Sequence, residues 1–266
     1  KKLNELVFGT ASQSPPWNDH DIWNGTERSF IMTTYWSLTT VCLSFFLWVI
    51  ASTGFKLIYG GGVNPGARAE AIESIWRWFG AMLLILAAPA LTDLVLTLSG
   101  VVTDAIRMAY DYTARTLSLN SSLGDFGGSA FTGDIDIHTG SVLGTALVKV
   151  FFAAVWVWFN VIYFVRKIVL TAMLCFTPVM ALFWAANKNV PAFAIWLSEL
   201  GSNALMPVAH ALVLCVILGI VDVKNVSRGG TWFHVLIAIY LLMPLAETIR
   251  NSIQSLFVRW AGVDEA

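Results

Sequence analysis

Charged residues are scarce in this chain. Only 12% of its 266 residues are Asp, Glu, Lys or Arg, whereas 57% are hydrophobic. A soluble domain typically carries about 25% charged residues, and half that share is too small to cover a globular surface. The formal net charge of −1 also argues against a nucleic-acid-coating domain, which would show a basic patch or stripe. The composition therefore predicts a protein whose solvent is the lipid bilayer.

Cysteine and histidine are also sparse, and common catalytic motifs are missing. The three cysteines lie far apart inside apolar runs, without the spacing of a disulfide framework or a C-x-x-C metal site. The four histidines show no metal-ligand spacing. The chain also lacks the phosphate-binding loop G-x-x-x-x-G-K-[ST], the G-x-S-x-G elbow and the H-E-x-x-H zinc motif. We therefore expect no enzyme activity, no metal and no cofactor.

Long apolar runs dominate the chain instead. A helix needs about 20 mostly apolar residues to cross a bilayer. The predicted spans are 30–59, 75–101, 141–165, 168–186, 203–221 and 231–249. The second helix is expected to continue past the membrane to about residue 117. The predicted fold class is all-α, a polytopic transmembrane helical bundle of about six membrane segments with kinked helices.

Polar stretches divide the chain further. In order, we expect an extramembrane N-terminal segment (1–28), two transmembrane helices (29–101), a helix extension with a Gly/Ser/Asp-rich extramembrane loop (102–140), a C-terminal transmembrane bundle (141–250) and a tail (251–266). Within the bundle, residues 187–202 are too short and too polar to cross but have an apolar side. They are predicted to form an interfacial or re-entrant amphipathic helix.

Two alternatives remain open for residues 141–186. At a rise of 1.5 Å per residue the stretch would be about 70 Å long, against a hydrocarbon core of about 30 Å. Either the chain turns back at the basic pair Arg166-Lys167, which then lies at the membrane interface, or one long helix leaves the membrane. The positive-inside rule favours an N-terminus outside. Without the turn, the later spans reverse their direction.

Polar residues inside the apolar runs are the functional candidates. An ionisable side chain at the bilayer centre costs about 2.5–3.5 kcal/mol on insertion scales. The intramembrane candidates are Asp93, Lys149 and Asn160. Asp93 is expected either to pack against another helix or to line a polar path, and Lys149 to reach an interface by snorkelling. Helix kinks are predicted at Pro89, Pro178 and Pro244.

A further polar stripe precedes the fifth span. Glu199, Asn203, Pro207 and His210 step by four, four and three residues, so they would share one face of a helix. We expect this stripe to fix the packing of the interfacial helix against a neighbouring span or subunit, with Pro207 allowing a bend. Three roles stay open for His210: an interhelical hydrogen bond, part of a conduit or switch, or a metal or heme ligand.

Residues 163–221 resemble a known family. The segments "YFVRKIVL", "CFTPVMALFWAANK" and "AIWLSELGSNALMPVAHALVL" are similar to the C-terminal half of TrbL-type polytopic subunits of type IV secretion and conjugation machines, in the VirB lineage. The resemblance is carried by Arg166, Lys167, Pro178, Trp184, Trp196, Glu199, Asn203, Pro207, His210 and Ala211.

This resemblance implies an inner-membrane platform without catalysis of its own. It implies a subunit that binds sister subunits in the lipid bilayer, forms homo-oligomers, and helps to move DNA or protein or to seed a pilus. The alternative is a stand-alone secondary transporter or ion channel, in which Asp93, Lys149 and His210 would converge near the midplane. A membrane enzyme is the third and least supported class, because the chain shows neither a nucleophile–base pair nor a metal cluster.

Overall fold

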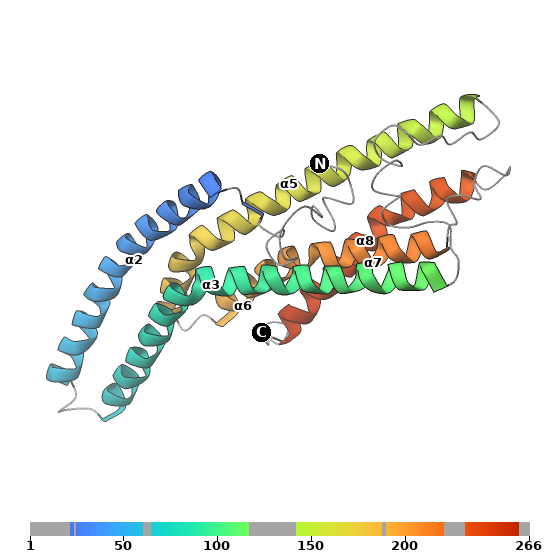
Figure 1. Ribbon diagram of the computed structural model, residues 1–266. Coiled ribbons are helices and arrows are strands. Elements are labelled where there is room, and N and C mark those ends of the chain that lie inside the picture. Colours follow the sequence, from blue (N-terminus) through green and yellow to red (C-terminus); the bar gives the residue numbers. More distant parts are fainter. Residues whose placement is uncertain are drawn as a thin grey trace. The chain divides into compact units, whose positions relative to one another are not determined.

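The computed structural model describes residues 22–23, 25–60, 65–116, 142–187, 190–220 and 232–260. Every regular element among these residues is an α-helix, which confirms the predicted fold class (Figure 1). In chain order the helices are α2 (Gly25–Gly60), α3 (Pro65–Thr116), α5 (Val142–Asn187), α6 (Val190–Ala204), α7 (Met206–Ile220) and α8 (Trp232–Trp260). Most of the predicted N-terminal segment, the Gly/Ser/Asp-rich loop and the end of the tail lie outside the described residues.

Four stretches of the described helices are long and apolar enough to cross a membrane. They are Gly25–Phe55, Ile72–Thr113, Val142–Ala186 and Phe193–Val216. Large apolar side chains cover the outside of these stretches; Phe30 and Trp48, for example, are 72% and 71% exposed. Because water would penalise such a surface and lipid does not, the chain is a multi-pass membrane protein. The α3 helix ends at Thr116, close to the predicted helix end at about residue 117.

The α5 helix decides between the two alternatives left open for residues 141–186. It runs without interruption from Val142 to Asn187, so the alternative in which the chain turns back at Arg166-Lys167 is wrong. The helix continues through the basic pair because residues 145–177 contain no glycine or proline that would break it. With 46 residues, α5 is about 70 Å long. It joins the predicted third and fourth spans into one element.

The described chain forms two compact units. Unit 1 contains Val95–Lys167 and Ser202–Ile253, and unit 2 contains Ile22–Leu94, Ile168–Gly201 and residues from Gln254 onward. The helices α3, α5, α6 and α8 each contribute residues to both units.

Aromatic side chains build much of the core of unit 2. Phe46 of α2 packs edge-on against Trp78 of α3, with ring centroids 4.7 Å apart. Trp196 of α6 is buried and stacks on Phe193, 5.8 Å between centroids. Edge-to-face and offset contacts of this kind add about 0.5–1.5 kcal/mol beyond the buried area. The Phe46–Trp78 contact thus fixes α2 against α3 within the unit.

In unit 1 the core lies between α5 and α7. Val155, Phe159 and Tyr163 recur at i, i+4 and i+8 on α5 and are all buried. On α7, Ala209 and Val213 repeat the same spacing and are also buried. This four-residue recurrence places one face of each helix inward, and the polar site described next lies on these faces.

Candidate functional site

The site begins at a helix break. The α6 helix ends at Ala204 and α7 begins at Met206, with Leu205 alone between them. The Leu205 carbonyl accepts the first bonds of α7, from the N–H groups of Val208 at 3.1 Å and Ala209 at 3.3 Å. The boundary predicted between residues 202 and 203 therefore lies at Leu205.

Pro207 stands in the first turn of α7. The N–H groups of a first turn have no partner inside the helix, so a proline is tolerated there. The predicted bend at Pro207 is instead a helix break two residues earlier, at Leu205. It divides the predicted stripe, because Glu199 and Asn203 belong to α6 while Pro207 and His210 belong to α7. The four residues therefore do not share one face of a single helix.

Arg166 of α5 caps the broken helix end in unit 1. Its Nε donates to the Asn203 carbonyl at 2.7 Å, and its Nη2 donates to the Ala204 carbonyl at 3.3 Å. Ser99 of α3 donates its hydroxyl to the same Ala204 carbonyl at 2.6 Å. The last carbonyls of a helix lack partners and lie at the negative end of its dipole. A buried guanidinium satisfies both needs; we call this arrangement of Arg166 and Ser99 the α6 cap.

The two residues of the predicted basic pair lie in different environments. Arg166 is only 8% exposed, whereas Lys167 is half-buried. Arg166 thus lies in the interior of unit 1. The cost of burying its charge is offset because its donors meet two backbone carbonyls that would otherwise be unpaired.

Asn203 connects α6 to α8. Its side chain is 1% exposed, and its Oδ1 accepts a bond from Arg250 Nη2 at 3.3 Å. The Nε of Arg250 is buried without a hydrogen-bond partner. Together with the α6 cap, this bond brings α3, α5, α6 and α8 to one point in unit 1.

His210 makes an interhelical contact. Its Nδ1 lies 3.2 Å from the Tyr163 hydroxyl of α5, and its ring packs edge-on against Phe159 with centroids 5.1 Å apart. The described residues contain no group of three or more His, Cys, Asp or Glu able to hold a metal ion. Of the three roles left open for His210, the interhelical hydrogen bond is the one that the geometry supports.

Beside His210 lies a cavity of about 130 Å³. We call it the α8 cavity, because α8 supplies two of its three polar side chains. It is lined by Trp158, Phe159, Ile162, Met206, His210, Glu247 and Arg250. The walls are thus apolar and aromatic, while an imidazole, a carboxylate and a guanidinium supply the polar groups.

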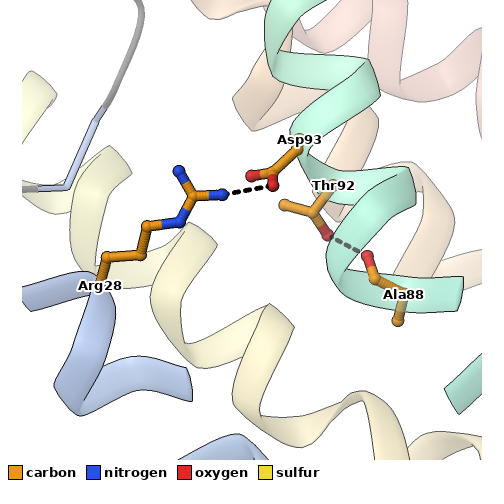
Figure 2. Close-up of polar contacts among 4 residues, drawn as sticks. All are labelled: Arg28, Ala88, Thr92 and Asp93. Atoms are coloured by element: carbon orange, nitrogen blue, oxygen red, sulfur yellow. Dashed lines mark hydrogen bonds and ion pairs between the residues drawn. The ribbon is translucent and has the colours of Figure 1, made fainter. Parts of the chain in front are cut away.

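Unit 2 contains a second set of interhelical bonds. Figure 2 shows Arg28 of α2 reaching Asp93 of α3, with 2.6 Å between Nη2 and Oδ2. Both side chains are about two-fifths exposed. Of the two roles expected for Asp93, this contact corresponds to packing against another helix. Next to Asp93, the Thr92 hydroxyl donates to the Ala88 carbonyl one turn earlier in α3, at 2.9 Å.

The backbone carbonyl that the α3 proline leaves without a donor has a partner on α2. Pro89 has no N–H, so it leaves the carbonyl four residues earlier, at Ile85, without its helical donor. The hydroxyl of Tyr35, which is fully buried on α2, donates to the Ile85 carbonyl. The backbone group freed by the proline is thereby satisfied from the neighbouring helix.

The α6 part of unit 2 is also bonded to its neighbours. Glu199 Oε1 accepts from Gln254 Nε2 at 2.7 Å, and the Ser198 hydroxyl donates to the Gln254 carbonyl at 3.3 Å. The Trp196 indole donates to the Met173 carbonyl of α5 at 3.2 Å. Glu199 therefore has a partner on α8.

A family model described as TrbL/VirB6 plasmid conjugal transfer like protein matches residues 1–258. The chain belongs to this family. The suspected resemblance is thus confirmed, and it extends well beyond residues 163–221, on which it was first seen. No curated protein and no solved structure matches the chain. Membership makes the TrbL/VirB6-like chain a multi-pass membrane component of a conjugal transfer system.

The other predicted residues of this TrbL/VirB6-like protein take less central positions. Lys149 is exposed on α5, and Asn160 is half-buried on the same helix. Pro178 and Pro244 lie inside the continuous helices α5 and α8. None of these four residues belongs to the α6 cap.

Sequence reasoning missed several partners in the two sets of bonds. They are Arg28, Tyr35, Ser99, Tyr163 and Arg250. Arg28 fell in the segment predicted to lie outside the membrane, and Arg250 fell just after the last predicted span. The available signal was indirect: a proline in a membrane helix implies a donor on a neighbouring helix.

Proposed function

We propose that this TrbL/VirB6-like chain is a platform or channel subunit of a type IV secretion machine of the conjugation type. In this proposal it lies in the inner membrane with its N-terminus outside. It assembles with sister subunits and with further copies of itself, and it helps DNA or protein to cross the membrane or seeds a pilus. The proposal assigns no catalysis to this chain.

The proposal is supported by the bonds that polar side chains make between helices. Arg166, Asn203 and His210 each bond a different helix or a helix end within unit 1. In unit 2, Asp93 pairs with Arg28. Polar groups used in this way fix the positions of helices against one another, as a subunit that holds other proteins in place requires.

A stand-alone transporter or ion channel remains the alternative. It needs polar groups that are available to a solute, with Asp93, Lys149 and His210 as the predicted set. Asp93 is instead engaged by Arg28 in unit 2, while Lys149 is exposed on α5. These contacts favour the platform over the transporter.

The first experiment measures the native mass of the complex. The chain is extracted gently from conjugating cells in mild detergent, and mass spectrometry identifies what co-purifies. We expect an assembly several times heavier than the 29.2 kDa chain, containing a secretion ATPase or pilin-like subunits. A lone monomer or small homo-oligomer would contradict the proposal, and solute flux through reconstituted protein would then test the alternative.

A second experiment tests the role of the buried polar residues. Asn203→Leu removes the acceptor of Arg250, and His210→Leu removes the bond to Tyr163. Both changes are expected to reduce the amount of assembled complex and the frequency of transfer. Lys149→Leu is the matched control, because Lys149 is exposed on α5. If both leucine variants assemble and transfer like the unchanged protein, these residues do not fix the packing that assembly needs.

A further inference from the structure

The α8 cavity contains two opposite charges that are not paired with each other. Glu247 and Arg250 stand three residues apart on α8, so they lie on the same side of that helix. Both line the cavity, but within the described part of the chain Glu247 forms no ion pair or hydrogen bond. A separated positive and negative charge beside apolar walls is complementary to a ligand that carries both charges itself.

The polar atoms of the cavity are partly free for such a ligand. The Nη2 of Arg250 donates to Asn203, and its Nε is buried. Its Nη1 is therefore the nitrogen that can donate to a ligand. On His210, Nδ1 is engaged by Tyr163, which leaves Nε2, able to donate when the Tyr163 hydroxyl donates to Nδ1. Guanidinium and imidazole N–H groups are good donors to a phosphate oxygen.

Two other groups that line the cavity suit a cation. Glu247 is an exposed carboxylate, and the indole of Trp158 is 49% exposed. A carboxylate attracts an ammonium group, and an indole face is the best aromatic partner for one. Groups that suit the anionic part and groups that suit the cationic part of one ligand thus line the same cavity.

The size of the cavity and the apolar surface beside it fit a lipid headgroup. An apolar cavity of about 150 Å³ holds a benzene-sized molecule, so 130 Å³ accommodates a small headgroup but not acyl chains. The lining residues belong to α5, α7 and α8 of unit 1. Val157 and Val161 of α5, next in sequence to the lining residues Trp158 and Ile162, are 53% and 52% exposed, and an exposed apolar surface of a membrane protein faces lipid.

We propose that the α8 cavity binds the headgroup of a phospholipid with a primary ammonium, a phosphatidylethanolamine. Its phosphate meets Arg250 Nη1 and His210, and its ammonium meets Glu247 and the Trp158 ring. The acyl chains leave the cavity past the exposed part of Trp158. The inference requires that the chain lies in a membrane, and it does not depend on the platform role.

The test is a competition among headgroups. The full chain is reconstituted with an equimolar mixture of phosphatidylethanolamine, phosphatidylcholine and phosphatidylglycerol that have identical acyl chains, and native mass spectrometry counts the retained lipid. We expect phosphatidylethanolamine to be retained in excess. Choline cannot donate a hydrogen bond to Glu247, and the glycerol headgroup carries no positive charge.

Glu247→Gln is the decisive variant. An exposed ion pair contributes a factor of roughly two to five, so the retained ratio of phosphatidylethanolamine to phosphatidylglycerol should fall by that factor. Glu73→Gln is the matched control, because Glu73 is an exposed carboxylate that pairs with Arg77 on α3. This control should leave the ratio unchanged.

A third variant tests the cavity itself. Ile162→Trp fills the space and should abolish lipid retention while the thermal midpoint in detergent stays close to that of the unchanged chain. Equal retention of the three lipids, or a lipid ratio unaffected by Glu247→Gln, would overturn the inference. The finding of a peptide from another subunit in place of a lipid would overturn it as well.

Discussion

Arg166 and Tyr35 donate to backbone carbonyls that have no donor within their own helix, one at a helix end and one at a proline. Arg166 bonds the carbonyls at the end of α6, and Tyr35 bonds the Ile85 carbonyl that Pro89 leaves without a donor. In hydrocarbon an unsatisfied backbone group costs several kcal/mol. At the scale of single residues, these two side chains are therefore expected to matter more than the exposed charges.

The first residue-scale prediction concerns Arg166. Arg166→Met removes both donors to the Asn203 and Ala204 carbonyls and leaves part of the α6 end unpaired. We expect a loss of about 1.5–3 kcal/mol in the free energy of unfolding, the usual range for hydrogen bonds to a charged group. The midpoint of thermal unfolding in detergent measures it. Arg166→Lys keeps the charge but loses the bidentate geometry, so its midpoint should fall between those of Arg166→Met and the unchanged protein.

Lys149→Met is the control for this prediction, because Lys149 is an exposed cation on the same helix. It should leave the midpoint nearly unchanged. If Arg166→Met and Lys149→Met lower the midpoint equally, the α6 cap does not stabilise the protein.

The second residue-scale prediction concerns Tyr35 and Pro89. Tyr35→Phe removes the hydroxyl that donates to Ile85 and should lower the free energy of unfolding by about 1 kcal/mol. In a Pro89→Ala background the restored N–H of residue 89 can donate to the Ile85 carbonyl, so the same change should cost much less. A double-mutant cycle on thermal midpoints measures the difference. Equal effects of Tyr35→Phe in both backgrounds would disprove the coupling.

At the scale of elements, the break between α6 and α7 shows what local sequence does not reveal. Pro207 was the local signal and pointed to a bend, but the break falls at Leu205. Its location depends on Arg166 and Ser99, which are distant in sequence and bond the end of α6. Tertiary contacts of this kind leave no trace in the periodicity of the segment itself.

A prediction at this scale follows from the position of Pro207. Because it stands in the first turn of α7, Pro207→Ala should change the free energy of unfolding by roughly 0.5 kcal/mol or less. Thermal unfolding in detergent measures the change. A loss comparable to that of Arg166→Met would show instead that Pro207 itself holds the break in place.

The α5 helix illustrates the opposite case. Its helical character was predictable, since residues 145–177 contain no helix breaker. Its continuity was left open because Arg166-Lys167 in an apolar run suggests a membrane interface. Charge alone does not reveal that Arg166 meets carbonyls of α6 in the interior of unit 1.

At the scale of the whole molecule, composition was the most informative signal. The scarcity of charge predicted a membrane protein, and the described helices have the lengths and apolar surfaces that this requires. The family was visible only in residues 163–221, where Pro, Trp, Asn and His stand at distinctive spacing. The first 140 residues match the same family, but their apolar helices share a composition with many other membrane proteins.

The unbroken α5 makes a prediction about topology. The segments before and after α5 should lie on opposite sides of the membrane, and an N-terminus outside puts the first of them outside. In a chain whose three cysteines are replaced, Ser129→Cys should react with an impermeant maleimide in intact cells and Lys188→Cys should not. Labelling at both positions would indicate a hairpin, and labelling at Lys188→Cys alone would reverse the orientation.

The α6 cap also has a consequence for the order of events during synthesis. The carbonyls that Arg166 bonds lie 37 and 38 residues further along the chain. Translation at about 5–20 residues per second makes them available roughly two to seven seconds after Arg166. Until then we expect α5, which is longer than the bilayer is thick, to be free to slide along its axis and to keep the guanidinium at the water boundary.

We expect the arrival of α6 to end this freedom and to set the depth of α5 in the membrane. A chain truncated after residue 189 should therefore leave Lys167→Cys open to an aqueous thiol reagent. The same position should be protected in a chain that continues through α7. The depth at which α5 finally rests is thus decided by residues that are not yet made when it enters the bilayer.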